Sequence, residues 1–369
     1  MFDRRLMQHF DWGLLIITIL LGVAGLTVLK SAVSAGTGDA QKILYFKQLI
    51  FFGIGVVVMI FSFAVSYKNL SRWSYRIYGL CITLLICVMF FGKYAGGSKR
   101  WLTFGPMSLQ PSELVKIAVV IVLARYYSEH ATADGLGFRD LIMPFILTII
   151  PFVLIAKQPD LGTAMTVFLI AASVTFFVKI RFKTLMALII IIIPIVISTW
   201  FVGLKDYQRQ RIFTFLDPDS DPLGRGYHIL QSKIAIGSGM MYGKGWMKGS
   251  QNILAFLPEH HTDFIFAVLS EEWGFVGASA VVLLLLTLVV WGLNIAYGCK
   301  DPFGTILAVG VTGIIFWQSF INVGMVMGLM PVVGVPLPFV SYGGSSIMTM
   351  MCCMGILMNI SMRRFMFEA

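Results

Sequence analysis

The sequence predicts an all-α, polytopic helical membrane protein, and three observations point to this fold class. Of its 369 residues, 58% are hydrophobic and only 12% are charged, whereas a soluble domain has about 25% charged residues. Apolar runs long enough to cross roughly 30 Å of hydrocarbon recur along the chain. Residues 185–197 are apolar at every position, which favours helices because strands of a membrane barrel alternate polar and apolar residues. A soluble enzyme, a secreted disulfide scaffold and a disordered chain are excluded.

About ten apolar segments have the length and composition of transmembrane helices. In chain order they are residues 12–29, 48–66, 75–92, 112–127, 141–156, 161–178, 184–203, 264–298, 304–329 and 339–361. The segment 264–298 is too long for one simple crossing. Residues 204–262, between spans seven and eight, are predicted to form a large extracytoplasmic loop of a single membrane domain that covers residues 1–369. The five cysteines lie in or next to apolar segments, so no disulfide framework is expected.

The distribution of basic residues predicts the orientation of the chain. Ten spans place both termini on one side of the membrane. Thirteen Lys and Arg residues fall on that side, against seven in the short loops of the other side. This bias favours cytoplasmic termini and an extracytoplasmic 204–262 loop. The net charge of +10 is then shared by both faces of the membrane, where anionic headgroups and a diphosphate lipid would meet it.

Ionisable residues at the start of two predicted spans are candidates for function, because charges are costly at membrane depth. Glu113 and Lys116 lie three residues apart on one helical face, directly after Ser112. They form either a local ion pair beside a helix cap or part of a functional site. Asp160, in a short turn after Pro159, is either an N-cap or a partner of Lys116 in a buried polar cluster.

A third acidic position, Asp263, lies at the entrance of the eighth apolar segment, where it is either a helix cap or a functional carboxylate. Glu271 and Glu272 follow deeper in the same segment and receive no role. Residues 335–346 combine two prolines with paired glycines. Such irregular backbone is tolerated at membrane depth only where it is buried or lines a wet cavity.

Several rare motifs run through and beyond the 204–262 loop. They are DYQRQRI at 206–212, residues 217–224, GYHI at 226–229, QSKIAIGSG at 231–239, GKGW at 243–246, LPE at 257–259 and HTDFIF at 261–266. Together they resemble the SEDS (shape, elongation, division and sporulation) family, most closely its elongation branch. The resemblance extends over residues 10–362, and the one departure noted is Met240-Met241, where the family tends to have glycine.

The resemblance implies a peptidoglycan glycosyltransferase of the bacterial inner membrane, with its active site facing the periplasm. Such an enzyme polymerises lipid II into β-1,4-linked glycan strands during cell-wall elongation and rod-shape maintenance. The implied partners are a class B penicillin-binding protein, other elongation-complex proteins and the undecaprenyl lipid, with no nucleic acid. By motif match, Asp263 corresponds to the essential catalytic aspartate, and Glu113, Lys116 and Asp160 to polar residues of the central cavity.

The donor sugar of the implied reaction is α-linked to a diphosphate, and the product linkage is β, so the configuration at the anomeric carbon is inverted. A single displacement of this kind needs a general base that removes the proton from the acceptor hydroxyl, and we assign Asp263 to this role. The departing diphosphate needs positive charge, from side chains or from a divalent cation such as Mg²⁺ or Mn²⁺ whose ligands the sequence does not identify. Two alternatives stay open: a lipid II flippase, which needs no general base, and a non-catalytic scaffold. The cationic candidates, of which Arg209 and Arg211 are preferred, are Lys99, Arg100, Arg209, Arg211, Lys233 and Lys244.

Overall fold

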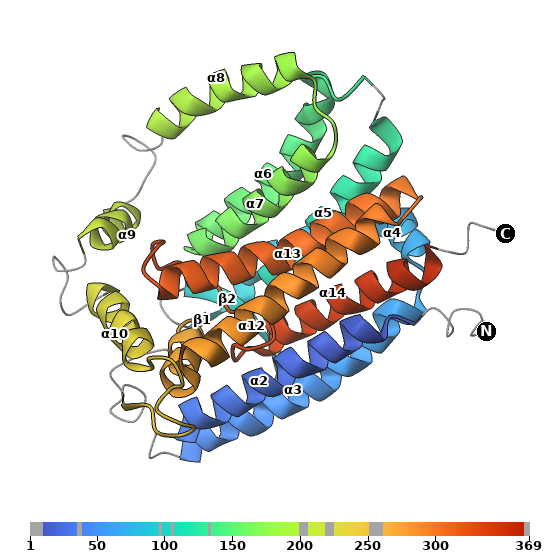
Figure 1. Ribbon diagram of the computed structural model, residues 1–369. Coiled ribbons are helices and arrows are strands. Elements are labelled where there is room, and N and C mark those ends of the chain that lie inside the picture. The colour runs from blue at the N-terminus through green and yellow to red at the C-terminus, as the bar shows by residue number, and fades with distance from the viewer. Residues whose placement is uncertain are drawn as a thin grey trace.

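The computed structural model describes residues 10–34, 39–95, 98–104, 107–131, 134–198, 206–217, 225–250 and 261–364. In this part of the chain, ten long helices match the ten predicted spans (Figure 1). They are α2 (Trp12–Ser34), α3 (Asp39–Ala64), α4 (Tyr67–Phe91), α5 (Pro111–His130), α6 (Ile142–Lys157), α7 (Leu161–Phe177), α8 (Phe182–Ser198), α12 (Ile265–Tyr297), α13 (Pro302–Val326) and α14 (Gly344–Arg363).

Seven candidate spans in the described chain are long and apolar enough to cross a membrane, and α7 and α8 are shorter apolar helices. The remaining helix, α5, carries Glu113, Lys116, Arg125 and Glu129, yet it is buried along most of its length. It packs against α4, α6, α7, α13 and α14, so protein rather than lipid surrounds it. The predicted helical, polytopic membrane fold is confirmed, and the five cysteines are free thiols.

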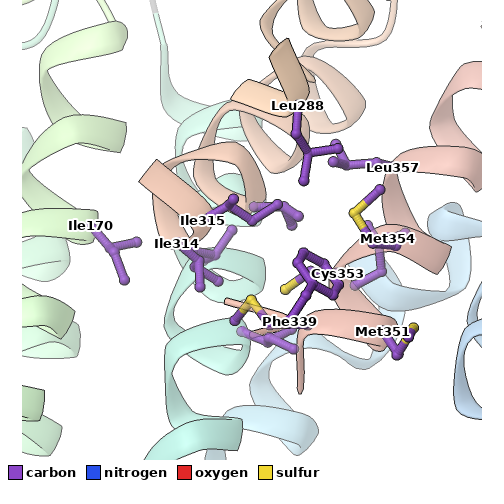
Figure 2. Packing of buried hydrophobic residues seen from close by; sticks show 14 of the residues in the cluster. Ile170, Leu288, Ile314, Ile315, Phe339, Met351, Cys353, Met354 and Leu357 are labelled. Carbon is purple, nitrogen blue, oxygen red and sulfur yellow. The ribbon is translucent and has the colours of Figure 1, made fainter. Parts of the chain in front are cut away.

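The apolar core joins the helices at the centre of the bundle (Figure 2). Ile314 and Ile315 of α13 face Cys353 and Met354 of α14, and Leu288 of α12 closes the cluster from another side. Unbranched methionine fills irregular spaces between helices, which suits α14, a helix that is buried almost throughout. By contrast, α8 lies apart from the other helices at the edge of the bundle (Figure 1).

The bundle has two distinct ends. Ser361 near the end of α14 donates a 2.9 Å hydrogen bond to Asp11, just before α2, so both ends of the described chain lie together. We call this the terminal end and the opposite one the distal end. The distal end carries the start of α5, α7, α12 and α14, together with helices α9 (Asp206–Leu216) and α10 (Arg225–Ser238). The 204–262 segment therefore contains helices that the sequence analysis did not predict.

A small antiparallel sheet at the distal end was also not predicted. Strands β1 (Lys93–Ala95), β2 (Ser98–Phe104) and β3 (Met107–Leu109) pair in the order β1-β2-β3. Leu102 of β2 faces Leu109 of β3, and Leu102 is buried. β1 and β3 have three residues each, and the seven residues of β2 do not alternate between polar and apolar, which explains why the sequence did not reveal them.

The unusual length of α12 has a structural cause at Gly274. This residue has φ 66° and ψ −166°, which interrupts the helical backbone. Glycine is suited to this conformation because it has no Cβ. The long segment 264–298 is therefore divided at a kink, because α12 consists of two helical parts that meet at Gly274.

Gly25 allows α2 to pack against the chain between α13 and α14. A Cβ at Gly25 would lie 2.5 Å from the carbonyl oxygen of Phe339 and 2.7 Å from Cα of Val340. We expect Gly25→Ala to lower the free energy of unfolding by about 1–3 kcal/mol, since backbone must shift to make room. Gly53→Ala is the control, because nothing lies within 4 Å of its Cβ position. Thermal unfolding in detergent measures both, and equal stability of the two variants would contradict the packing.

Candidate functional site

Residues 327–343, between α13 and α14, form the centre of the distal end; we call them the linking segment. They contain no regular helix or strand, and Val335, Leu337, Phe339, Val340 and Ser341 are buried. Irregular backbone at membrane depth must find hydrogen-bond partners inside the protein. Those partners show which elements the linking segment brings together.

Gln48 connects α3 to the linking segment, and Ser341 and Tyr342 connect the linking segment to the residues before α12. Gln48 Nε2 donates to the carbonyl oxygen of Ser341 at 3.2 Å, and Gln48 Oε1 accepts from the amide of Gly343 at 3.1 Å. Ser341 Oγ donates to the carbonyl oxygen of Thr262 at 2.7 Å. The amide of Tyr342 donates to the carbonyl oxygen of His261 at 3.0 Å. Two consecutive residues of the linking segment thus hold the backbone that precedes Asp263.

Asp263 itself is held by Asn322 of α13. The Nδ2 group of Asn322 donates to the carbonyl oxygens of Asp263 and Val335, at 2.9 and 2.7 Å. The side chain of Asp263 is half-buried, and its Oδ2 lies 3.2 Å from the Cβ position of Gly334. The N-cap position of α12 is Phe264, with no side-chain cap. Capping therefore does not account for an acidic residue at position 263.

Asp160 occupies the N-cap position of α7, as one of the two sequence interpretations predicted. Its Oδ1 accepts from the amide of Thr163 at 3.2 Å. Its Oδ2 lies 3.7 Å from Nη1 of Arg100 and accepts from Gln110 Nε2 at 3.4 Å. The expectation that Asp160 pairs with Lys116 is wrong: the ion pair found for Asp160 among the described residues is with Arg100, because β2 places the guanidinium beside this turn.

Glu113 and Lys116 form the predicted local ion pair, with 2.6 Å between Glu113 Oε1 and Lys116 Nζ. Both side chains are almost completely buried. Ser112 does not cap the helix, because Gln110 occupies the N-cap position and makes no side-chain cap bond. Glu113 Oε2 has no hydrogen-bond partner within the described part of the chain. The ammonium group of Lys116 is therefore the main group that stabilises the buried negative charge of Glu113.

The linking segment brings Asp160 and Asp263 toward one place. A Cβ on Gly162, in the first turn of α7, would lie 2.3 Å from the carbonyl oxygen of Val333. The next residue, Gly334, is the one beside the Asp263 carboxylate. The two acidic residues thus flank consecutive residues of one backbone segment. The linking segment therefore connects two acidic residues that lie far apart in the sequence.

The cationic candidates have different surroundings. Lys244 is paired with Glu271 at 2.7 Å, so it lies in a contact between the 204–262 segment and α12. Lys233 of α10 packs against Gly328, whose Cβ position is 2.8 Å from Nζ. Lys99 is exposed on β2, and Arg209 and Arg211 are half-buried on α9. Of the six cationic candidates, Arg100 is the one that the described residues show in contact with a carboxylate of the site, that of Asp160.

Gln48 and Asn322, which position the site, were missed from the sequence, and Ser341 was included only as part of the irregular segment 335–346. Each is fully or almost fully buried. Gln48 and Asn322 are amide side chains within helices of membrane-spanning length, and this was the available signal. A buried amide in a membrane helix is expected to bind backbone or another polar group, because an unpartnered one is costly.

An apolar helical bundle with an internal ion pair, and with acidic residues gathered at one end, defines a polytopic membrane protein with a polar site at its distal end. The family model "Cell cycle protein" for FtsW, RodA and SpoVE matches residues 8–365. The chain belongs to this family, which is the SEDS family.

Relatives of known name and structure cover almost the whole chain. Peptidoglycan glycosyltransferase MrdB of Escherichia coli strain K12 is 40% identical over 358 residues, covering 97% of this chain and 95% of the relative. Stage V sporulation protein E of Bacillus subtilis strain 168 is 39% identical over 363 residues, covering 95% and 96%. A solved structure described as "Structural coordination of polymerization and crosslinking by a peptidoglycan synthase complex" superposes with a TM-score of 0.81 at 28% identity, covering 96% and 98%. The crystal structure of Thermus thermophilus RodA gives 0.71 at 26%, with the same coverage.

Proposed function

We propose that the chain is a peptidoglycan glycosyltransferase that polymerises lipid II into β-1,4-linked glycan strands during cell-wall elongation, with Asp263 as the general base. The observation that carries the mechanism is the placement of Asp263: a half-buried carboxylate on a backbone that Asn322 fixes at the distal end. The relatives named peptidoglycan glycosyltransferase support the reaction class.

The chemistry requires one proton acceptor beside the acceptor sugar. Asp263 removes the proton from the acceptor hydroxyl as its oxygen attacks the anomeric carbon of the donor. The bond from that carbon to the diphosphate breaks at the same time, and undecaprenyl diphosphate leaves. Attack from the face opposite the leaving group converts the α linkage to β, as in other single-displacement reactions at a sugar.

Positive charge for the departing diphosphate comes from arginine side chains in this proposal. Arg209 and Arg211 on α9 stay the preferred pair, and Arg100 is added because it lies at the Asp160 end of the site. Lys99 and Lys233 remain candidates from the distal surface. Lys116 and Glu113 shape the interior of the bundle instead, since each is buried and bonded to the other.

A resident metal ion does not fit the described residues. Within them, no group of three or more His, Cys, Asp or Glu side chains is placed to hold an ion. The mechanism therefore contains no step through a bound metal. In this proposal, a divalent cation such as Mg²⁺ or Mn²⁺ would enter bound to the diphosphate of the substrate. Chelation followed by add-back of the ion tests this.

The proposed setting is the bacterial inner membrane, with both termini cytoplasmic and the distal end facing the periplasm, as the basic residues predict. The proposed partner is a class B penicillin-binding protein, within a larger elongation complex. Its support is the similar solved structure described as a complex that coordinates polymerization and crosslinking.

Purified protein in liposomes with lipid II tests the proposed function. We expect glycan strands on a gel, made by the chain alone or together with its transpeptidase partner. A flippase would instead move lipid II across sealed vesicles without making strands, and a scaffold would do neither. Either of these results, obtained with and without the partner, would overturn the proposal.

Asn322→Ala tests whether the hydrogen bonds that hold the backbone of Asp263 and Val335 matter for catalysis. The variant leaves the carbonyl oxygens of Asp263 and Val335 without their donor, which costs about 1–3 kcal/mol for each buried group. We expect kcat to fall while KM changes little, because the base loses its fixed position. The control is Asn294→Ala, a polar residue at the terminal end of α12. Rates are divided by the amount of folded protein, measured by size-exclusion chromatography, and a normalised kcat equal to that of the wild type would indicate general loss of folded protein instead.

A further inference from the structure

Residues 239–245, the glycine-rich turn that follows α10, are joined to α12 at its kink; we call them the distal turn. The amides of Phe275 and Val276 donate to the carbonyl oxygens of Met240 and Met241, at 2.8 and 3.1 Å. In the other direction, the amides of Lys244 and Gly245 donate to the carbonyl oxygens of Glu271 and Glu272, each at 3.0 Å. Backbone groups that the kink removes from the helix are thus paired with the turn.

Side chains add to this attachment. Buried Glu271 pairs with Lys244, and Glu272 accepts from Ser31 of α2. Trp246 donates from Nε1 to the carbonyl oxygen of Thr27 at 3.1 Å. The distal turn and the residue that follows it are therefore fixed to both α2 and α12.

The depth of the distal turn follows from the lengths of these two helices. At the terminal end, Trp291 donates to Asp11 at 3.0 Å and packs on Gly13, and tryptophan beside a charge is typical of the membrane interface. From Trp291 up to Phe275, α12 rises about 24 Å. From Gly13 up to Ser31, α2 rises about 27 Å, so the two helices agree.

The hydrocarbon core is about 30 Å thick. Phe275, and with it the distal turn, therefore lies about 6 Å inside the distal boundary of the hydrocarbon. Any tilt of the helices moves the turn deeper, because tilt reduces the height gained per residue. The kink must then be sealed by protein, since no water is present at this depth to bind the free backbone groups.

The exposed side chains of the distal turn fit this depth. Met240, Met241 and Tyr242 are 80%, 55% and 83% exposed. They adjoin Phe275 and Val276, which are also exposed and belong to the outer face of a membrane helix. Met240 has a positive φ of 46°, a conformation that is unfavourable for a side-chain-bearing residue. Three large apolar or aromatic side chains on a fixed turn thus extend the lipid-facing surface of α12.

We propose that the distal turn is inserted in the lipid leaflet at the distal end, with Met240, Met241 and Tyr242 in contact with lipid. The turn anchors the 204–262 segment at the membrane surface, next to the site where a lipid-linked substrate arrives. Amphipathic segments commonly lie about 5–10 Å into the boundary between headgroups and acyl chains. This anchor does not depend on the proposed reaction.

Spin labels at single cysteines test the insertion. The positions are Met241→Cys in the turn, Leu283→Cys on the exposed face of α12 as the lipid control, and Lys248→Cys as the water control. Each is made in full-length protein with the five native cysteines replaced by alanine. The protein is reconstituted in vesicles of phosphatidylethanolamine and phosphatidylglycerol, and collision rates with oxygen and with a water-soluble nickel chelate are measured by EPR.

We expect the oxygen-to-nickel ratio at position 241 to match that of 283 and to exceed that of 248 severalfold. A ratio like that of 248 would place the turn in water and overturn the proposal. Low collision rates with both reagents would show that protein, such as a second copy of the chain, covers the turn, and would also overturn it.

A second measurement uses the native cysteine background, in case the cysteine-free protein does not fold. Met241→Cys is treated with a membrane-impermeant maleimide in vesicles and again after detergent is added. We expect labelling only in detergent, whereas Lys248→Cys reacts in both conditions. Immediate reaction of position 241 in intact vesicles contradicts the insertion, and so does failure to react in detergent.

Discussion

Asp263→Ala is expected to lower kcat for glycan polymerisation by about 10²- to 10⁴-fold, the range contributed by a general base. The reason is that the half-buried carboxylate of Asp263 is the proton acceptor in the proposed displacement. The arginines of the site cannot replace it, because a guanidinium group does not accept protons. The measurement is steady-state strand formation from purified lipid II, with the amount of folded protein determined by size-exclusion chromatography.

The control for this variant is Asp217→Asn. Asp217 follows α9 and is exposed, so its replacement removes a negative charge from the distal end without changing the linking segment. We expect wild-type activity from the control. Equal loss in both variants would mean that overall charge, and not a base at position 263, sets the rate.

Lys116→Met is expected to destabilise the protein by about 3–5 kcal/mol, the cost of leaving one member of a buried ion pair alone. Glu113 Oε2 already has no partner within the described residues, so loss of Lys116 leaves the carboxylate poorly compensated. The double variant Glu113→Gln with Lys116→Met should recover much of this loss, because no buried charge remains. Chemical unfolding in detergent measures all three proteins.

The ion pair between Arg125 and Glu129 provides a comparison within the same helix. Both side chains are partly exposed, at 34% and 40%, and solvent-exposed pairs contribute about 0–1 kcal/mol. Glu129→Gln should therefore change the free energy of unfolding little. If Lys116→Met were no more harmful than Glu129→Gln, the buried pair would not have the structural role described here.

The sequence predicted the helical architecture because hydrocarbon imposes a length and a composition on every span. Each of the ten predicted spans matches a helix, including the charged helix α5, although the ends differ by up to nine residues at the start of α3. It did not predict the β-sheet at 93–109 or helices α9 and α10, since short elements at the distal end lack a long periodic pattern. It also did not predict that Gly274 interrupts α12, because glycine occurs in many continuous membrane helices.

For the site, the sequence identified individual residues and missed their partners. Glu113 and Lys116 pair as their spacing predicted, because positions three apart on a helix are neighbours. The partner of Asp160 is Arg100, some sixty residues earlier, and only the fold of β2 brings it there. The same applies to Gln48 and Ser341, which lie far apart in sequence and meet through the linking segment. Tertiary pairings of this kind leave no periodic signal in a single sequence.

The role of Asp263 as base is tested most directly by Asp263→Asn in a single turnover. The amide has the same shape as the carboxylate and cannot accept the acceptor's proton as a base. Labelled lipid II is bound to the protein in vesicles, and formation of the first β-1,4 bond is followed in time. We expect wild-type binding of lipid II and a first bond that forms at least about 10²-fold more slowly. Bond formation at the wild-type rate would contradict the assignment of Asp263 as the base.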